Sequence, residues 1–113
     1  MIRSISVAIV LMATPAAADM LDGVNHQLAD KARAIVATCG STIISGYRRT
    51  RVRGTRHMSL HASGRAVDIR GNPRCIYQML KGWPGGYSTD YRRVMHVHIS
   101  IGGHEHGLRF RHR

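Results

Sequence analysis

Two histidines in the C-terminal half of this sequence, His96 and His98, are placed to do chemistry together. They belong to the alternating segment 94–101, where side chains on a strand would point to opposite faces in turn. Val97 and Ile99 would then face a core, while His96 and His98 would share the other face. A strand of this kind presents two imidazoles to one patch of surface.

An acid can join these histidines. In the segment 65–70 the same alternation buries the β-branched residues and leaves Asp68 on the opposite face. His61 lies seven residues before Asp68, and the connection has room for one turn. If the two strands belong to one sheet, we expect Asp68 and the histidines to converge.

Two histidines and a carboxylate are a common ligand set of catalytic zinc, with water in the fourth position. Structural zinc sites normally have four protein ligands, so a set of three favours a catalytic site. Nitrogen and oxygen donors also accept other divalent metals, but zinc fits this donor set best. The sequence therefore predicts one Zn²⁺ ion per chain.

The joint motif pattern resembles a known group of zinc peptidases, the D-Ala-D-Ala carboxypeptidases. The similar segments are Ser-Gly-Tyr-Arg at 45–48, Ser-Leu-His-Ala-Ser-Gly-Arg-Ala-Val-Asp-Ile at 59–69, and His-Val-His-Ile-Ser at 96–100. That group shares a superfamily with lysostaphin-type endopeptidases and the hedgehog signalling domain. The resemblance covers residues 45–100 and keeps the order of the motifs.

The resemblance implies roles for individual residues. His61, Asp68 and His98 match the three metal ligands of the group. His96 matches the first histidine of the His-x-His motif, which in relatives is thought to assist the attacking water or stabilise the oxyanion. We therefore expect His96 to be the catalytic residue beside the metal.

Substrate contacts follow from the same resemblance. Arg48 matches an arginine that often holds a substrate carboxylate, and Ser59 matches a serine that lines the substrate site. Members of the group often carry a glutamate near the last ligand as general base, and neither Asp90 nor Glu105 has that spacing. Glu105 is instead a candidate to orient a ligand histidine through a hydrogen bond.

The remaining histidines and the arginine-rich segment receive a plainer interpretation. We expect these histidines to be surface or structural residues: His26, His57, His104, His106 and His112. Arginines 49, 51, 53 and 56 are interpreted as a solvated basic loop, and Trp83 and Phe110 as core or cleft wall.

A small α+β domain must position these residues. Apolar residues at three- and four-residue spacing predict a helix over 20–38, ended by Gly40, and a second helix begins at Pro73. Strands are predicted over 41–47, 65–70 and 94–101, with loop over 48–60 and 82–86 and an irregular tail. We expect a small antiparallel sheet covered by two helices; the resemblance implies a hedgehog/D-Ala-D-Ala peptidase-like arrangement.

The N-terminus has the pattern of a secretory signal peptide. Arg3 precedes an apolar run over 5–12, and small residues end at Ala18. The run is too short to span a bilayer, and the alternative is an ordinary buried helix. We expect residues 1–18 to be removed and 19–113 to form a zinc peptidase-like domain, periplasmic or secreted and without stable membrane insertion.

The two cysteines, Cys39 and Cys75, fit an exported chain. An even count in such a protein predicts a disulfide bond between them. The alternative, in which both thiols bind metal, lacks the Cys-x-x-Cys pair that such sites usually contain.

Charge and resemblance together suggest the partners. Lys and Arg number 17 against 6 acids, a formal net charge of +11. In a cytoplasmic protein this charge would indicate binding to nucleic acid. The polyanions that an exported protein meets are cell-wall polymers and acidic lipid headgroups. We expect peptidoglycan peptides as substrates, no nucleic acid as a partner, and a monomer.

The resemblance implies an exported zinc metallopeptidase that hydrolyses peptidoglycan, of the D-Ala-D-Ala carboxypeptidase or murein endopeptidase type. The alternative is a non-catalytic zinc-containing module that binds cell-wall peptide.

Overall fold

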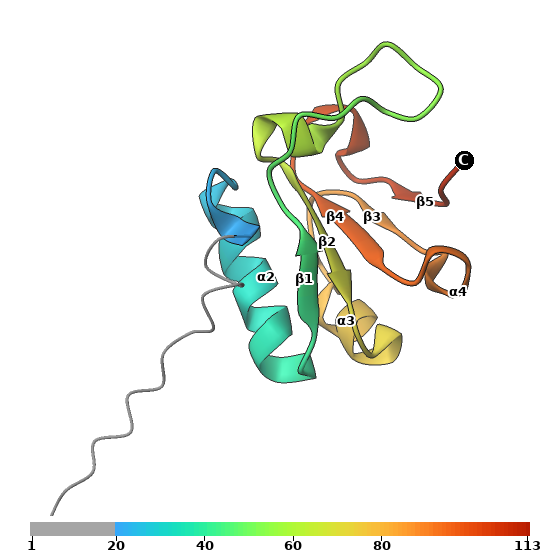
Figure 1. Cartoon of the computed structure of the whole chain (residues 1–113). Helices are drawn as coiled ribbons and strands as arrows, with labels where there is room; N and C mark the ends of the chain where they lie inside the picture. The colour runs from blue at the N-terminus through green and yellow to red at the C-terminus, as the bar shows by residue number, and fades with distance from the viewer. Residues whose placement is uncertain (1–19) are drawn as a thin grey trace, which may run out of the picture.

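A five-stranded sheet is the centre of the structure, a computed structural model that describes residues 20–113 (Figure 1). Its strands are β1 (Thr42–Ser45), β2 (Ala66–Arg70), β3 (Tyr87–Ser88), β4 (Val97–Ser100) and β5 (Arg109–Phe110), in the spatial order β1-β2-β4-β3-β5. β1, β2, β4 and β3 pair antiparallel, but β5 runs parallel to β3. The sheet is therefore mixed. The purely antiparallel sheet expected from the sequence is wrong because the tail returns alongside β3.

Within residues 22–113 the α-helices that accompany the sheet are α2 (His26–Cys39), α3 (Pro73–Met79) and α4 (Tyr91–Val94). Two short 3₁₀ helices, η1 (Leu60–Ser63) and η2 (Gly103–Glu105), lie beside the strands that carry the site. The α+β class is confirmed, and α3 begins at Pro73 as expected. The predicted signal peptide, residues 1–18, lies outside the described residues.

The first helix begins later than its apolar periodicity predicted. Asn25 caps α2, since its side-chain oxygen accepts a hydrogen bond from the Leu28 amide at 3.2 Å. Gly23 has a positive φ of 76°, and the chain turns there before the helix starts. The end of the helix is as expected, with Gly40 in the left-handed conformation.

The predicted strand over 94–101 is also shorter in the structure. Its first residue ends α4, and Met95 takes a positive φ of 58°. The alternating sequence therefore becomes a strand only from Val97. β3 and β5 were not predicted, because two residues each are too few to show a period of two.

The sheet has one apolar face and one polar face, as the alternation predicted. Helices α2 and α3 lie on the same side of it (Figure 1). The core between them contains the side chains of Leu28, Ala32, Ile35, Ile76, Val67, Ile69, Val97 and Ile99. Asp68 and His98 point away from this core and face each other across paired strands, because β2 and β4 align them directly.

Cys39 and Cys75 form a disulfide bond that joins the end of α2 to α3. The predicted pairing is confirmed. A disulfide is typical of proteins in oxidising compartments. Among residues 20–113, every helix is too short or too polar to cross a bilayer.

Removing the disulfide should weaken the metal-free fold. The bond closes a loop with a sequence separation of 36, and cross-linking a loop of this length contributes about 3–4 kcal/mol in the chain-entropy model. We expect the double variant Cys39→Ser, Cys75→Ser to lose about that much free energy of unfolding, measured by urea denaturation in the presence of a chelator. An unchanged free energy would show that the cross-link does not constrain the unfolded chain.

Candidate metal centre

Three buried side chains come together on the polar face of the sheet. His61 lies on η1, Asp68 on β2 and His98 on β4. One potential ligand atom from each lies within 4.8 Å of the other two. The predicted trio is therefore brought together as a group that could bind a metal ion, although the geometry does not identify the metal.

The backbone fixes the orientation of His61. Its Nδ1 lies 2.8 Å from the carbonyl oxygen of Gly46, which only accepts hydrogen bonds, so Nδ1 must carry the hydrogen. Nε2 then points into the cluster, 3.4 Å from Asp68 Oδ2. It is buried and has no hydrogen-bond partner.

Gly64 makes the turn that returns His61 to the strand. It ends η1 in the left-handed conformation with a φ of 68°. A Cβ atom at this position would also lie 1.9 Å from the carbonyl oxygen of Gly23. Only glycine fits both requirements, which explains its place between His61 and Asp68.

Asp68 supplies the negative charge at the centre of the group. Its Oδ1 lies 3.1 Å from His98 Nδ1, and its Oδ2 faces His61. Burial alone would raise the pKa of this carboxyl, but its hydrogen bond with His98 and the attraction of the two neighbouring histidines outweigh burial and hold the pKa well below its usual range. Asp68 is therefore an anion at neutral pH.

His98 lies between two carboxylates. Nδ1 contacts Asp68, and Nε2 lies 2.8 Å from Glu105 Oε1. Burial alone would lower the pKa of His98, but the hydrogen bonds with Asp68 and Glu105 raise it to about 9. Without a metal, this ring is thus a buried imidazolium at neutral pH. The interpretation of Glu105 as the residue that orients a ligand histidine is supported by this contact.

The donor set fits a small divalent cation. Ligands at the usual zinc distances around a tetrahedral ion lie about 3.3 Å apart. The distances from Asp68 to His61 Nε2 and to His98 Nδ1 are 3.4 and 3.1 Å. A buried ring nitrogen that faces a carboxylate oxygen without forming a hydrogen bond is unfavourable unless another group, such as a cation, lies between them. This unpartnered Nε2 is the strongest indication of metal binding.

His96 stands beside the group without belonging to it. Its Nε2 lies 3.9 Å from Asp68 Oδ1, and its Nδ1 lies 3.1 Å from the Val94 carbonyl oxygen. Because that carbonyl oxygen only accepts hydrogen bonds, Nδ1 carries the hydrogen, and Nε2 is left as the nitrogen that can accept a proton. Burial lowers the pKa of His96 and outweighs the attraction of Asp68. His96 is therefore suited to take up a proton near the cluster.

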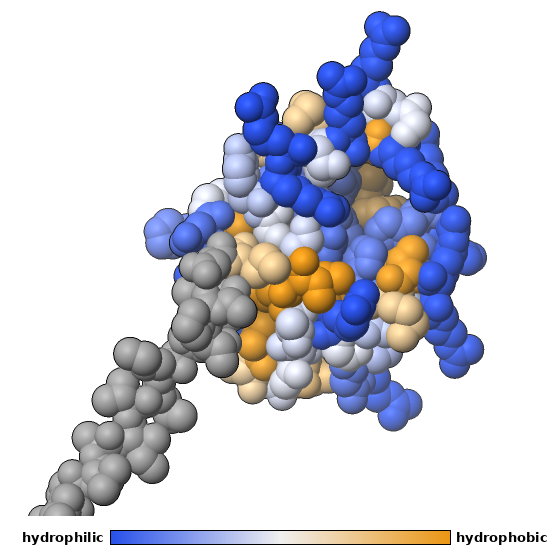
Figure 2. Space-filling view, in the orientation of Figure 1, coloured by the Kyte–Doolittle hydropathy of each residue, from blue (hydrophilic) through white to orange (hydrophobic). Residues whose placement is uncertain are grey.

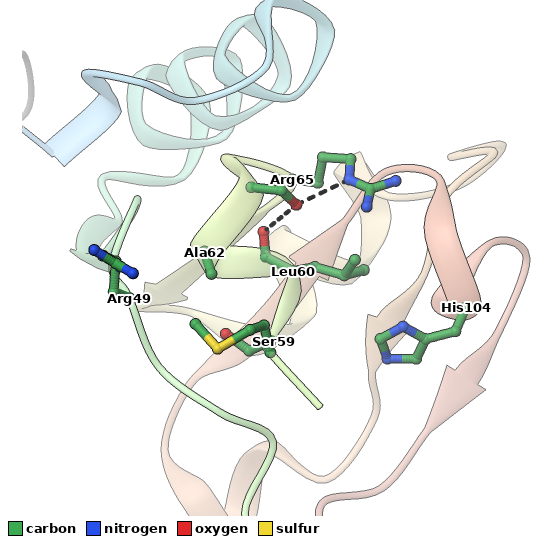
Figure 3. Close-up of a pocket in the computed structure, with 8 residues that line it drawn as sticks. Arg49, Ser59, Leu60, Ala62, Arg65 and His104 are labelled. Atoms are coloured by element: carbon green, nitrogen blue, oxygen red, sulfur yellow. Dashed lines mark hydrogen bonds between the residues drawn. The ribbon is translucent and has the colours of Figure 1, made fainter. Parts of the chain in front are cut away.

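The two predicted substrate residues lie in different places. Arg48 Nη2 is 3.5 Å from Asp68 Oδ2, at the exposed side of the group. Ser59 lines a separate pocket of about 370 Å³, together with Arg49, Arg65 and His104. Figure 3 shows Arg49 and His104 on opposite sides of this pocket. The structure brings Arg48 to the cluster, and none of the three candidate ligands lines the pocket that contains Ser59.

The arginine-rich segment forms an exposed loop. It projects from one end of the molecule, where Figure 2 shows hydrophilic side chains extending outward. Arginines 49, 51, 53 and 56 are exposed, and within residues 20–113 none of them forms an ion pair. This arrangement agrees with their interpretation as a solvated basic surface.

The C-terminal tail adds two rings beside the site: Phe110, which was interpreted as core or cleft wall, and His112. Phe110 packs edge-on against His98, with ring centroids 5.6 Å apart, and His112 lies 5.0 Å from His96 in the same manner. His112 was expected to be an ordinary surface or structural histidine. No periodicity could have placed it here, because its position depends on how the glycine-rich tail returns to β3.

Comparison with known proteins gave no relative: no family model, no curated protein and no solved structure matches this chain.

Removing the Glu105 carboxylate should weaken metal binding. Partners of this kind fix the ring of a ligating histidine and raise its basicity, and their loss typically costs 10–100-fold in affinity. We expect Glu105→Ala to reduce zinc affinity by about that factor, measured by competition with a chromophoric chelator. Glu105→Gln, which can still accept the hydrogen bond from His98, should lose less, and His106→Ala should lose nothing. Equal affinity in wild type and Glu105→Ala would contradict the assignment.

Metal uptake should also depend on pH. Because the pKa of His98 is raised to about 9 in the metal-free protein, zinc at Nδ1 must displace a proton at neutral pH. We expect the apparent affinity to rise with pH until it passes about 9. Calorimetry in buffers of different ionisation enthalpy measures the released proton directly. A pH-independent affinity with no proton release would mean that His98 is not a ligand.

Proposed function

We propose that this protein is an exported zinc metallopeptidase that hydrolyses peptide bonds in peptidoglycan, of the D-Ala-D-Ala carboxypeptidase or endopeptidase type. The observation that carries the proposal is the unpartnered Nε2 of His61, directed at Asp68 in a buried group of three donors. Within residues 20–113 this group has three members, which leaves a coordination position for water or substrate. The motif resemblance supplies the substrate class.

The residues around the group suit hydrolysis of an amide. When bound, zinc would polarise the amide carbonyl and activate water. His96 accepts the proton of the attacking water or, once protonated, hydrogen-bonds the developing oxyanion. The Arg48 guanidinium, half exposed beside Asp68, can bind a substrate carboxylate in bidentate fashion. Ser59, in its own pocket, would contact a more distant part of the substrate.

The proposed compartment agrees with the chemistry. A cross-linked fold is suited to the periplasm or the extracellular space, where peptidoglycan is found. The basic surface would attract anionic wall polymers before the peptide enters the site. The N-terminal pattern that predicts a signal peptide supports the same location.

A second candidate is a non-catalytic zinc-containing module that binds cell-wall peptide. The observation that favours it concerns Glu105, the only glutamate of the chain. Its carboxylate is engaged with His98, so it is not free to act as the general base that many members of the group carry near the last ligand. In this alternative the same residues bind peptide without breaking a bond.

The test begins with the metal content of the protein with residues 19–113. We expect about one zinc per chain, since three protein ligands define one site. The zinc-loaded protein is then incubated with muropeptides that end in D-Ala-D-Ala or contain cross-links, and the products are resolved by mass spectrometry. Asp68→Asn serves as the metal-free control. Binding without cleavage would support the binding module, and a protein that takes up no zinc would overturn both.

A further inference from the structure

The tail histidine, His112, is held in place by a buried carboxylate. Asp90 Oδ1 accepts a hydrogen bond from His112 Nδ1 at 2.9 Å, and Oδ2 accepts one from the His112 backbone amide at 2.8 Å. The Asp90 side chain is only 1% exposed. Burial alone would raise the pKa of Asp90, but its hydrogen bonds with His112 lower the pKa below its ordinary value. Asp90 is thus an anion directed at one histidine.

Asp90 would ordinarily have a different task. It occupies the N-cap position of α4, where an aspartate usually accepts a hydrogen bond from the first turn of the helix. Here the side chain makes no capping bond, and both of its oxygens contact His112 instead. The Asp90 carboxylate therefore binds His112 and not the amides of the helix.

Further contacts fix the same stretch of tail. The Thr89 amide donates to the Phe110 carbonyl at 2.8 Å, within the parallel pairing of β3 with β5. Arg93 donates to the carbonyl oxygen of His112. The backbone is therefore fixed at Phe110 and at His112 itself.

The ring faces the candidate metal centre. Its centroid lies 5.0 Å from that of His96 and 6.3 Å from that of His98, in edge-on arrangements. Because Nδ1 is directed at Asp90, Nε2 on the other side of the ring is left for another partner. Among the described residues no group bonds to this Nε2, and the side chain is 27% exposed. The side chain is therefore partly open to solvent, with one ring nitrogen uncommitted.

We propose that His112 is a catalytic residue of this site and that Asp90 is its positioning residue. His112 Nε2 hydrogen-bonds the amide that reacts beside His96, and the Asp90 carboxylate fixes the ring and its tautomer. An aspartate that orients a histidine in this way is a recurrent feature of hydrolytic sites on unrelated folds. The identity of the reacting amide rests on the proposed function, whereas the contact between His112 and a bound peptide does not.

His112→Asn is the variant that separates catalysis from structure. The asparagine amide can still donate to Asp90 from near the position of Nδ1, so the tail remains tethered, but nothing replaces Nε2. We expect His112→Asn to keep its zinc content and melting temperature and to lose at least about tenfold in kcat on muropeptides with little change in KM. Asp90→Asn should lose less, and the matched tail control His106→Ala should behave as wild type. Full kcat in His112→Asn, or loss of its zinc, would overturn the proposal.

A second measurement does not depend on turnover. The imidazole nitrogens of zinc-loaded, ¹⁵N-histidine-labelled protein are followed by NMR during titration with acetyl-D-Ala-D-Ala. We expect the Nε2 resonance of His112 to shift on binding. A shift without hydrolysis would refute the proposed peptidase but keep His112 as a peptide contact. A saturable peptide complex that leaves the His112 resonances unmoved would refute the role of His112.

Discussion

Replacing His61, Asp68 or His98 with alanine is expected to release most of the bound zinc. Each change leaves two protein ligands, too few for a tight site of this type. The effect should be similar for all three residues, because they come from three separate elements and none can substitute for another. Zinc is measured by mass spectrometry of the purified protein after dialysis against a weak chelator.

The control for these variants must separate lost coordination from lost folding. All three residues are buried, so truncation to alanine also removes hydrogen bonds and contacts. Asp68→Asn keeps the shape of the side chain and removes its negative charge, and it should lose zinc while keeping the disulfide-linked fold. His26→Ala, on the first helix, should keep its zinc. If all three alanine variants retain stoichiometric zinc, the metal is bound elsewhere.

Replacing His96 with alanine is expected to abolish most hydrolysis and to leave the metal in place. Its Nε2 is near Asp68 but outside the group of three donors, so the ligands are untouched. General acid–base assistance is worth about 10²–10⁴-fold in rate, and we expect kcat to fall within that range. The measurement is kcat on D-Ala-terminated or cross-linked muropeptides, with zinc content determined on the same sample.

The variant His96→Gln refines this result. Glutamine can still form a hydrogen bond from the same position but cannot take up a proton near neutral pH. Recovery of much of the activity in His96→Gln would indicate stabilisation of the oxyanion, and no recovery would indicate proton transfer. Loss of zinc from His96→Ala would make His96 a ligand. Unchanged turnover in that variant would move the proton-handling role to another residue, and His112 is then the nearest imidazole.

The residues of the metal group were predictable because a strand has a period of two. Asp68 and His98 each alternate with β-branched residues, and that local pattern determines which face they occupy. The direct pairing of the two across β2 and β4 requires only that the strands be neighbours. His61 was predictable through the short connection with Gly64, whose left-handed turn returns the chain to the strand.

The residues around the group were less predictable because their positions depend on the path of the tail. Glu105 follows Gly102 and Gly103, which both have positive φ, and His112 comes after a further positive-φ residue, Gly107. Such a segment has no periodicity from which a direction could be read. The short parallel pairing of β5 with β3, which sets the position of His112, leaves no signal in two residues of sequence.

The start of the first helix was predicted wrongly for a different reason. A capping residue, Asn25, was present in the sequence, but the apolar spacing across residues 21–36 suggested one continuous helix. In the structure the cap and the turn at Gly23 prevail over that periodicity. The early start predicted for the last strand has a similar origin, since the alternating pattern gave no warning of the left-handed turn at Met95.

The two-faced sheet also makes this chain a practical scaffold for redesign. On β2 and β4 the odd-numbered positions pack in the core with the helices, and the even-numbered positions 68 and 98 belong to the candidate metal group. Ligand chemistry can therefore be varied at those two positions without disturbing the packing that holds the helices to the sheet. A library that exchanges histidine and carboxylate there would sample metals of different preference on one unchanged framework, with the cross-link between α2 and α3 maintaining the other face.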